Sequence, residues 1–192
     1  MILVLTGKSG SGKSTIKDIL CRDMGCKKII TYTSRPKRKG ETENDYHFVT
    51  DEKFFNMMKH KEFTEVKSYH PATGGTWWYG SKITDEQINS PDIYIIILTP
   101  AGYKDIRRIV PNDRMKCVYL HCTTTILEQR LYNRGDLPEE IVRRLNADAS
   151  DFKGMLDSAD KTILCSKMKP EDIASVIISF MTENSKSTVK NA

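Results

Sequence analysis

The segment GKSGSGKS at residues 7–14 constrains the fold of this chain more than any other feature. It fits the phosphate-loop pattern G-x-x-x-x-G-K-[ST]. An apolar run at residues 2–6 precedes it, and a helical pattern with Ile16 and Leu20 on one face follows it. A flexible Gly/Ser linker needs neither neighbour, whereas a buried strand that leads through a glycine loop into a helix needs both. The sequence therefore predicts a phosphate loop.

Such a loop binds the polyphosphate of a nucleotide. Successive N–H groups of the loop and the N-terminus of the following helix point at one spot and form an anion-binding nest. Lys13 is expected to reach the β- and γ-phosphates, and the Ser14 hydroxyl is expected to ligate Mg²⁺. The candidate ATP-binding residues of this segment are Gly7, Lys8, Ser9, Gly10, Ser11, Gly12, Lys13, Ser14 and Thr15. The loop alone indicates a nucleoside triphosphate and leaves the reaction open.

Buried-strand patterns alternate with helical patterns through most of the chain. The strands are expected at residues 2–6, 28–33, 93–98, 116–121 and 162–165, and the helices at 14–24, 101–110, 124–133, 139–156 and 171–181. This alternation predicts an α/β protein, a three-layer P-loop NTPase core with a parallel sheet covered on both faces. The polar residues 183–192 are expected to fray.

Residues 34–89 interrupt this alternation. They contain short half-polar strands at 46–49, 63–69 and 76–79, the last two forming a hairpin with a glycine-rich tip, and one helix that Asp51 could cap. The pattern predicts a small mixed α/β lobe at 34–89, inserted into a core made of residues 1–33 and 90–192.

Composition excludes several classes of protein. With 192 residues, 39% of them hydrophobic and 29% charged, the chain is neither collagenous, coiled-coil nor wholly disordered. The net charge of +5 suits an anionic partner such as a free nucleotide. No apolar run is long enough to span a bilayer and no targeting signal opens the sequence, so the expected location is the cytoplasm. The odd number of cysteines, without a Cys-x-x-Cys motif, predicts free thiols rather than disulfides or zinc ligands; they are Cys21, Cys26, Cys117, Cys122 and Cys165.

Four further blocks of sequence resemble the guanylate kinase family and occur in that family's order. They are TSRPKRKGE at 33–41 with DYHF at 45–48, EFTE at 62–65, WYGS at 78–81, and RLYNRG at 130–135 with RL at 144–145. The resemblance is collinear from the first strand to about residue 145 and is looser beyond it. Taken alone, the basic run 35–39 would fit a solvated surface patch or a localisation signal as well as it fits a phosphate-binding segment.

The resemblance implies a nucleoside monophosphate kinase of purine nucleotide metabolism that transfers the γ-phosphoryl group of ATP, with Mg²⁺, to GMP or dGMP. The implied monophosphate-binding residues are Thr31, Arg35, Arg38, Tyr46, Glu65, Tyr79, Ser81, Thr99 and Arg144. Glu65 would accept hydrogen bonds from N1–H and the 2-amino group of guanine, because a carboxylate only accepts.

A helical lid is expected at about residues 130–145, where Arg130 and Arg134 would contact ATP. The residues expected to act in catalysis are Lys13, Arg35, Arg130, Arg134 and Arg144. Arg143 is expected only to pair with Glu139 on the helix surface, and Glu140 offers a similar local partner to Arg144. The resemblance implies a monomer or homodimer without a nucleic-acid or membrane partner.

The chain departs from the family pattern at the end of the strand expected at 93–98. The family has an Asp-x-Asp pair there, one residue near the metal and one on guanine, whereas this chain has Ile97 and Thr99, and Asp92 lies at the other end of the strand. Glu65 is then the principal guanine discriminator, and Ser14 with the phosphates is the main hold on Mg²⁺. The loop at 66–78 is longer than is usual in the family.

Two alternatives to GMP phosphorylation stay open at this point. One is a kinase of the same family that acts on another (deoxy)nucleoside monophosphate. The other is a phosphopeptide-binding module that has lost catalysis, although such a module has no reason to keep Lys13 and Ser14. Trp77 and Trp78 are expected to pack rather than to stack on a ligand.

Overall fold

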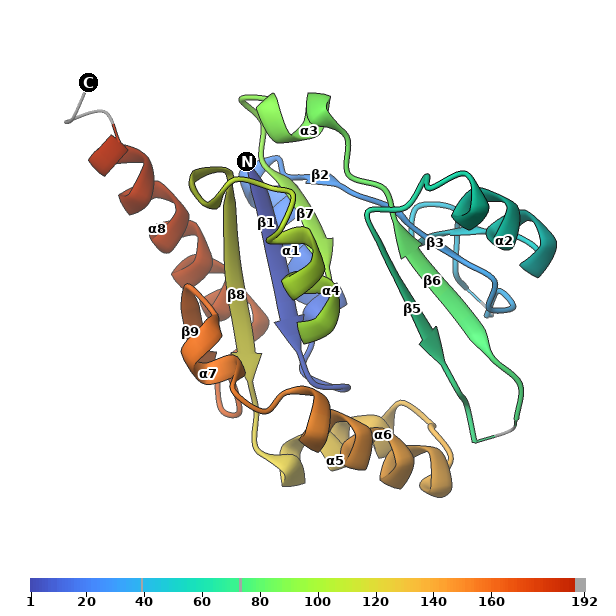
Figure 1. Cartoon of the computed structure of the whole chain (residues 1–192). Coiled ribbons are helices and arrows are strands. Elements are labelled where there is room, and N and C mark those ends of the chain that lie inside the picture. Colours follow the sequence, from blue (N-terminus) through green and yellow to red (C-terminus); the bar gives the residue numbers. More distant parts are fainter. Residues whose placement is uncertain (39, 73, 189–192) are drawn as a thin grey trace.

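The computed structural model describes residues 1–38, 40–72 and 74–188. These residues form two β-sheets that lie beside each other, with helices packed around them (Figure 1). Lys39, in the basic run of the sequence, and residues 189–192 lie outside the described residues. The larger sheet consists of β2 (Lys27–Lys28), β7 (Tyr94–Ile97), β1 (Ile2–Gly7), β8 (Met115–His121) and β9 (Lys161–Leu164), in that order. All its pairings are parallel, which confirms the predicted α/β class.

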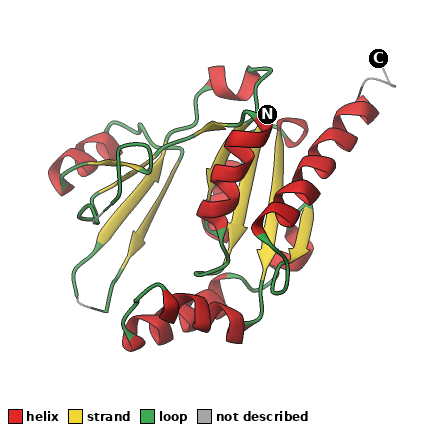
Figure 2. Cartoon of the chain, turned by 180° about the vertical axis from the view of Figure 1, so that it is seen from behind, coloured by secondary structure: helices red, strands yellow, loops and turns green. Residues whose placement is uncertain are grey.

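Helices cover both faces of this core sheet, as Figure 2 shows from behind. Alternate residues of β1 serve opposite faces, because successive side chains of a strand point to opposite sides. Leu3 and Leu5 pack with helices α1 (Lys13–Met24) and α8 (Pro170–Thr188). Ile2 and Val4 pack on the other face, which α4 (Pro100–Ile106) and α7 (Met155–Ser158) cover. The three predicted layers are therefore present.

The second sheet is smaller and mixed. It consists of β4 (Tyr46–Phe48), β3 (Thr31–Thr33), β6 (Trp77–Ser81) and β5 (Glu65–Tyr69), with helices α2 (Asp51–Lys59) and α3 (Asp85–Asn89) in the same part of the chain. The single strand predicted at 28–33 is wrong. Its first residue, Lys28, pairs with Ile95 of β7, whereas Tyr32 pairs with Gly80 of β6, so the run passes from one sheet to the other.

One face of the second sheet is occupied by aromatic packing against α2. Phe54 of α2 stacks on Phe63 with ring centroids 4.6 Å apart, and it also lies 6.3 Å from the ring of Trp78. Trp77 points to the opposite face, where it stacks on Tyr69 at 5.7 Å. The prediction that both tryptophans pack is confirmed, and beyond the Trp77–Tyr69 pair the opposite face of the sheet carries polar side chains.

Two helices, α5 (Thr124–Asn133) and α6 (Pro138–Asp151), follow the carboxyl end of β8 and lie below both sheets in Figure 1. The helix predicted at 139–156 is too long, because Gly154 adopts a positive φ of 83° and separates α6 from α7. A short 3₁₀ helix, Asn112–Arg114, precedes β8.

Several predicted helix ends differ from the structure. Thr50, not Asp51, caps α2, and its hydroxyl accepts a hydrogen bond from the N–H of Lys53 at 3.2 Å. Helix α4 ends at Ile106, earlier than predicted. Helix α8 continues to Thr188, beyond the predicted end at residue 181. Among the described residues, none of the helices combines the length and apolar character of a membrane span.

The prediction of five free thiols is also wrong. Cys122 and Cys165 form a disulfide with Cα atoms 5.4 Å apart, while Cys21, Cys26 and Cys117 are free. Each bonded cysteine directly follows a core strand, and the preceding residues His121 and Leu164 are partners in the parallel register of β8 and β9. This adjacency depends on strand order, which cysteine spacing in the sequence does not reveal.

Candidate active site

The phosphate loop joins β1 to α1 with the backbone geometry that anion binding requires. Gly10 and Gly12 have φ values of 80° and 91°, which other residues rarely adopt. A Cβ at Gly7 would lie 2.9 Å from the carbonyl oxygen of Leu120 in β8, so the loop also needs glycine there for close packing. These three glycines place the loop at the carboxyl end of the core sheet.

Lys13 folds back over this loop. Its Nζ donates to the carbonyl oxygens of Gly7 at 2.6 Å and Lys8 at 2.9 Å. Desolvation lowers the pKa of Lys13 to about 8, and the nearby carboxylate of Asp148 opposes that effect. Ser14 and Thr15 are exposed at the start of α1. An ammonium group held at the loop with few protein anions around it is suited to bind phosphate.

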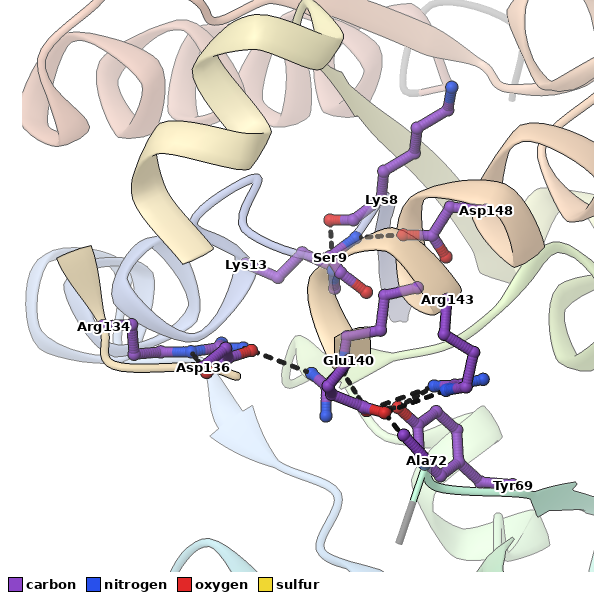
Figure 3. Close-up of polar contacts among 11 residues, drawn as sticks. Lys8, Ser9, Lys13, Tyr69, Ala72, Arg134, Asp136, Glu140, Arg143 and Asp148 are labelled. Atoms are coloured by element: carbon purple, nitrogen blue, oxygen red, sulfur yellow. Dashed lines mark hydrogen bonds and ion pairs between the residues drawn. The ribbon is translucent and has the colours of Figure 1, made fainter. Parts of the chain in front are cut away.

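Asp148 of α6 is a loop partner that the sequence did not indicate. Its Oδ2 accepts a hydrogen bond from the Ser9 N–H at 2.6 Å (Figure 3). It lies four residues after Arg144, hence one helical turn further along the same face of α6. Because 139 positions separate it from Ser9, no local sequence signal could have predicted the contact.

Polar residues predicted to bind the acceptor nucleotide share one face of the second sheet. Tyr79 and Ser81 alternate along β6, and Ser81 lies opposite Glu65 of β5 in the register. On the other side, Thr31 of β3 lies opposite Tyr46 of β4. The strand register thus brings five predicted residues, far apart in the chain, onto one surface.

Arg35 provides the positive charge of this surface. Its side chain is only 3% exposed, and its guanidinium lies 5.4 Å from the ring centre of Tyr46. Its Nη2 donates to Glu41 at 2.6 Å. Burial alone would lower the pKa of Arg35, but hydrogen bonds to Glu41 and Tyr79 hold it above its ordinary value. The guanidinium is fixed and charged, as phosphate binding requires.

Arg38 and the two tyrosines complete this cluster. The Tyr46 and Tyr79 ring centroids are 5.9 Å apart, and burial raises the pKa of Tyr46. Arg38 is exposed, and its backbone N–H donates to Glu41 at 2.8 Å. Glu41, a residue of the same motif, therefore holds the segment in place by accepting hydrogen bonds from the Arg35 side chain and from the Arg38 backbone.

Glu65 lies at the other end of the same face and is 8% exposed. Burial raises its pKa, while hydrogen bonds from Ser81 oppose the rise. Ser81 Oγ is also 3.4 Å from Thr31 Oγ1. A Cβ at Gly102 would lie 3.0 Å from Oε2 of Glu65, so glycine at that position of α4 leaves room for the carboxylate. An ionised carboxylate can only accept hydrogen bonds, so a buried one is suited to a base that presents two adjacent donors.

The end of β7 provides no carboxylate. Ile97 ends the strand, and Thr99 caps α4 by accepting a hydrogen bond from the N–H of Gly102 at 3.3 Å. Thr99 is thereby placed within one helical turn of the residue that makes room for Glu65. Across the described ranges, no three His, Cys, Asp or Glu side chains gather as a metal site.

The three predicted lid arginines have different surroundings. Arg130 of α5 donates to the carbonyl oxygen of Gly10 at 3.4 Å, so it contacts the phosphate loop directly. Arg134 lies just past the end of α5 and is 49% exposed; its Nε donates to Asp136 at 2.9 Å, in a two-point contact. Arg144 of α6 is 14% exposed and is bound by Glu140 at 2.7 Å.

The charges of Arg134 and Arg144 both lower the pKa of Lys13, after desolvation, so these arginines lie near the loop lysine. The Arg38 charge contributes to the lowered pKa of Asp136, after its hydrogen bond to Arg134, so the acceptor-side segment approaches the lid. The Arg143 partner is Glu140, three residues before it, and not Glu139 as predicted.

The fold, the phosphate loop and the two polar surfaces are those of a P-loop phosphotransferase. Comparison with known proteins identifies the family. The family model described as guanylate kinase matches residues 1–163, and the chain belongs to the guanylate kinase family.

Individual relatives agree. A guanylate kinase of Prochlorococcus marinus subsp. pastoris is 31% identical over 170 residues, which cover 83% of this chain and 89% of that protein. One of Paramagnetospirillum magneticum is 31% identical over 153 residues, covering 79% of this chain and 70% of that protein. The crystal structure of guanylate kinase from Anaplasma phagocytophilum superposes with a TM-score of 0.72 and 21% identity, over 95% of this chain and 85% of that one, and so shares the fold.

Proposed function

We propose that this chain transfers the γ-phosphoryl group of ATP to GMP or dGMP, giving ADP and the corresponding diphosphate. One observation carries the proposal: buried Glu65 lies on β5, and buried Arg35 follows β3 of the same sheet by two residues. A carboxylate for the base at one end and a guanidinium for the phosphate at the other fit a guanine monophosphate. The lobe assigned to residues 34–89, together with β3, is its proposed binding unit.

Each group of residues has a proposed task. The loop amides and Lys13 bind the polyphosphate of ATP, and Arg35, Arg38, Tyr46 and Tyr79 hold the acceptor phosphate. The acceptor oxygen is already ionised at neutral pH, so no general base is needed, and transfer depends on alignment of the two phosphates and on stabilisation of the charge between them.

The lid arginines Arg130, Arg134 and Arg144 are proposed to stabilise that charge. Arg130 already contacts the loop carbonyl of Gly10, and Arg144 lies close enough to affect Lys13. Helices α5 and α6 also exclude water when they cover the phosphates, which prevents hydrolysis of ATP in place of transfer.

Mg²⁺ is the proposed cofactor with ATP. The donor set fits it in part: the exposed Ser14 hydroxyl follows the loop lysine, as a P-loop ligand does, while Ile97 and Thr99 offer no carboxylate. Held by Ser14 and the nucleotide, the ion would neutralise part of the phosphate charge. Because Ser14 would be the one protein ligand among the predicted residues, we expect the ion to be held mainly by the nucleotide.

The proposal is tested by a coupled assay of ADP release with Mg-ATP and a panel of ribo- and deoxyribonucleoside monophosphates. GMP and dGMP are expected to give the highest kcat/KM. Lys13→Ala is expected to abolish turnover, while Lys17→Ala, on the same helix outside the loop motif, serves as the matched control. Equal rates with AMP and GMP would refute the guanine assignment, and substantial turnover by Lys13→Ala would refute the role of the loop lysine.

A kinase for another monophosphate remains the second candidate, because Ile97 and Thr99 replace the acidic pair expected there. The same panel decides between the two acceptors. We further propose that the chain works on free nucleotides in the cytoplasm, as a step of purine nucleotide metabolism.

A further inference from the structure

The extended β5–β6 hairpin contacts helix α6 (Figure 3). The Tyr69 hydroxyl donates to Oε1 of Glu140, and the Ala72 N–H donates to Oε2 of the same carboxylate at 3.1 Å. At the C-terminal end of α6, Asp151 pairs with Lys67 of β5 at 2.9 Å. The hairpin whose length was unexplained in the sequence therefore binds the lid helix at two places.

The same carboxylate binds two arginines of its own helix. Glu140 accepts from Nε of Arg143 at 2.9 Å and from Nε of Arg144 at 2.7 Å. Both guanidinium groups also lie over the Tyr69 ring, at 4.4 Å and 5.5 Å from its centre. We call the set Tyr69, Ala72, Glu140, Arg143 and Arg144 the hairpin–lid clasp.

The clasp is a charged network rather than a surface ion pair. Partial burial alone would raise the pKa of Glu140, but hydrogen bonds from Arg143, Tyr69 and Arg144 hold it far below its ordinary value. Burial, with the hydrogen bond to Glu140, raises the pKa of Tyr69 to about 12. The carboxylate stays ionised and the phenol stays neutral over the physiological range, so the network keeps one protonation state.

The clasp also orients a site residue. Arg144 is held at Nε by Glu140, and its Nη1 lies 3.7 Å from Asp136, which in turn binds Arg134. The two carboxylates therefore hold two lid arginines beside the phosphate-loop lysine, whose pKa both arginines lower. Glu140 and Arg144 could pair on the helix surface without Tyr69, because they are four residues apart on α6. The hydrogen bond from Tyr69 adds a link between this ion pair and the hairpin.

On the basis of the proposed function, we propose that Tyr69 and Glu140 are positioning residues. They fix Arg144 for phosphoryl transfer, and they join the acceptor-binding sheet to the lid so that ATP and the monophosphate bind cooperatively. The physical reason is that β5 also carries Glu65 of the acceptor surface, while α6 also carries Asp148 at the phosphate loop. A nucleotide that orders β5 thus also orders α6, and the reverse holds as well. The second nucleotide then binds to a site that is already ordered, so it binds more tightly.

The kinetic test uses Tyr69→Phe and Glu140→Gln, with Tyr132→Phe and Glu139→Gln as matched controls. Both control side chains are exposed on α5 and α6 and undergo the same chemical change. Each clasp variant is expected to lower kcat about 10-fold, because misplacement of a group that acts in the transition state reduces kcat, while the KM for ATP at saturating GMP rises only by the coupling that is lost, about threefold. The controls are expected to match the wild type.

The binding test measures the Kd of GMP by calorimetry, with and without the magnesium complex of a non-hydrolysable ATP analogue. The wild type is expected to bind GMP at least about fivefold more tightly with the analogue present, and the clasp variants less than about twofold. Tyr69→Phe keeps the ring beneath both arginines and removes only the hydroxyl, which donates to Glu140 and accepts from Arg143, so this variant tests the clasp even if Glu140→Gln fails to fold.

The two hypotheses fail in different ways. Absence of wild-type turnover with every acceptor would overturn the proposed function, and this inference with it. Normal wild-type turnover, together with unchanged kcat in Tyr69→Phe or equal coupling in wild type and folded variants, would overturn the clasp alone. Wild-type binding of GMP that does not respond to the ATP analogue would also overturn it.

Discussion

Replacement of Glu65 by glutamine is the most direct test of the proposed base-binding surface. The change keeps the size of the side chain and one carbonyl acceptor, but it removes the charge and introduces an amide donor. Glu65 is 8% exposed and lies against Gly102 and Ser81, so the new amide has little room to turn away. It would face the donors of guanine with a donor of its own.

The expected loss follows from the burial of this group. A hydrogen bond to a charged partner contributes about 1.5–3 kcal/mol, and RT is about 0.59 kcal/mol, so kcat/KM for GMP should fall about 10- to 150-fold. AMP presents no pair of adjacent donors on that edge, and its kcat/KM should change less than about threefold. The GMP/AMP ratio therefore carries the prediction, since a general loss of folding would lower both.

The pH dependence provides an independent check. Burial raises the pKa of Glu65, although Ser81 opposes the rise, so the carboxylate gains its proton above the ordinary value of 4.5. The protonated form accepts poorly, and kcat/KM for GMP in the wild type should therefore fall as the pH is lowered toward that pKa. Glu65→Gln should lack this acidic limb.

The coupled ADP-release assay measures both substrates across this pH range. Glu62→Gln is the matched control, because it makes the same change in the same sequence block, at a side chain that is 37% exposed and paired with Lys82. An unchanged GMP/AMP ratio in Glu65→Gln, or an equal loss for both nucleotides, would refute the reasoning.

Four further outcomes are expected. kcat/KM for ATP should fall above about pH 8, because Lys13 of the free protein then loses its proton. kcat should hold to higher pH, because bound phosphate raises the pKa of Lys13. A kcat/KM for ATP that does not change with pH in this range would contradict the prediction. Arg38→Ala should raise the KM for GMP about 10-fold with a smaller effect on kcat, and an unchanged KM would exclude the contact. Reduction of the Cys122–Cys165 disulfide should lower the free energy of unfolding in urea by up to about 4 kcal/mol for a sequence separation of 43, and the reductant should have no effect on Cys122→Ser. Asp148→Asn should lower the KM for ATP about threefold, because a carboxylate leaves the phosphate loop; a raised KM would mean that the carboxylate assists binding.

Local sequence patterns could predict the core because the residues that specify its elements are close to one another in the sequence. The apolar run, the glycines and the amphipathic helix of residues 2–24 define strand, loop and helix within one continuous segment. The alternation of strands and helices then predicts the parallel sheet. The family motifs extend the prediction to the residues of the acceptor surface, including Arg35 and Glu65.

Within those motifs, the sequence determined which chemical groups are present. It did not determine how the segment at 28–33 is divided between two sheets, because the same β-forming residues suit either edge, and the choice depends on the partners β7 and β6. The disulfide has the same origin: β8 and β9 must first be neighbours before Cys122 and Cys165 can meet.

The contacts that join the parts of the site were decided by tertiary structure alone. Asp148 reaches Ser9 across 139 positions, and Tyr69 reaches Glu140 across 71. An aspartate, a tyrosine and a glutamate have no distinctive spacing, and each would read as an ordinary surface residue in the sequence. Their roles arise because packing of α6 beneath both sheets brings charged groups from distant segments within hydrogen-bond distance, where partial burial makes their pairing strong.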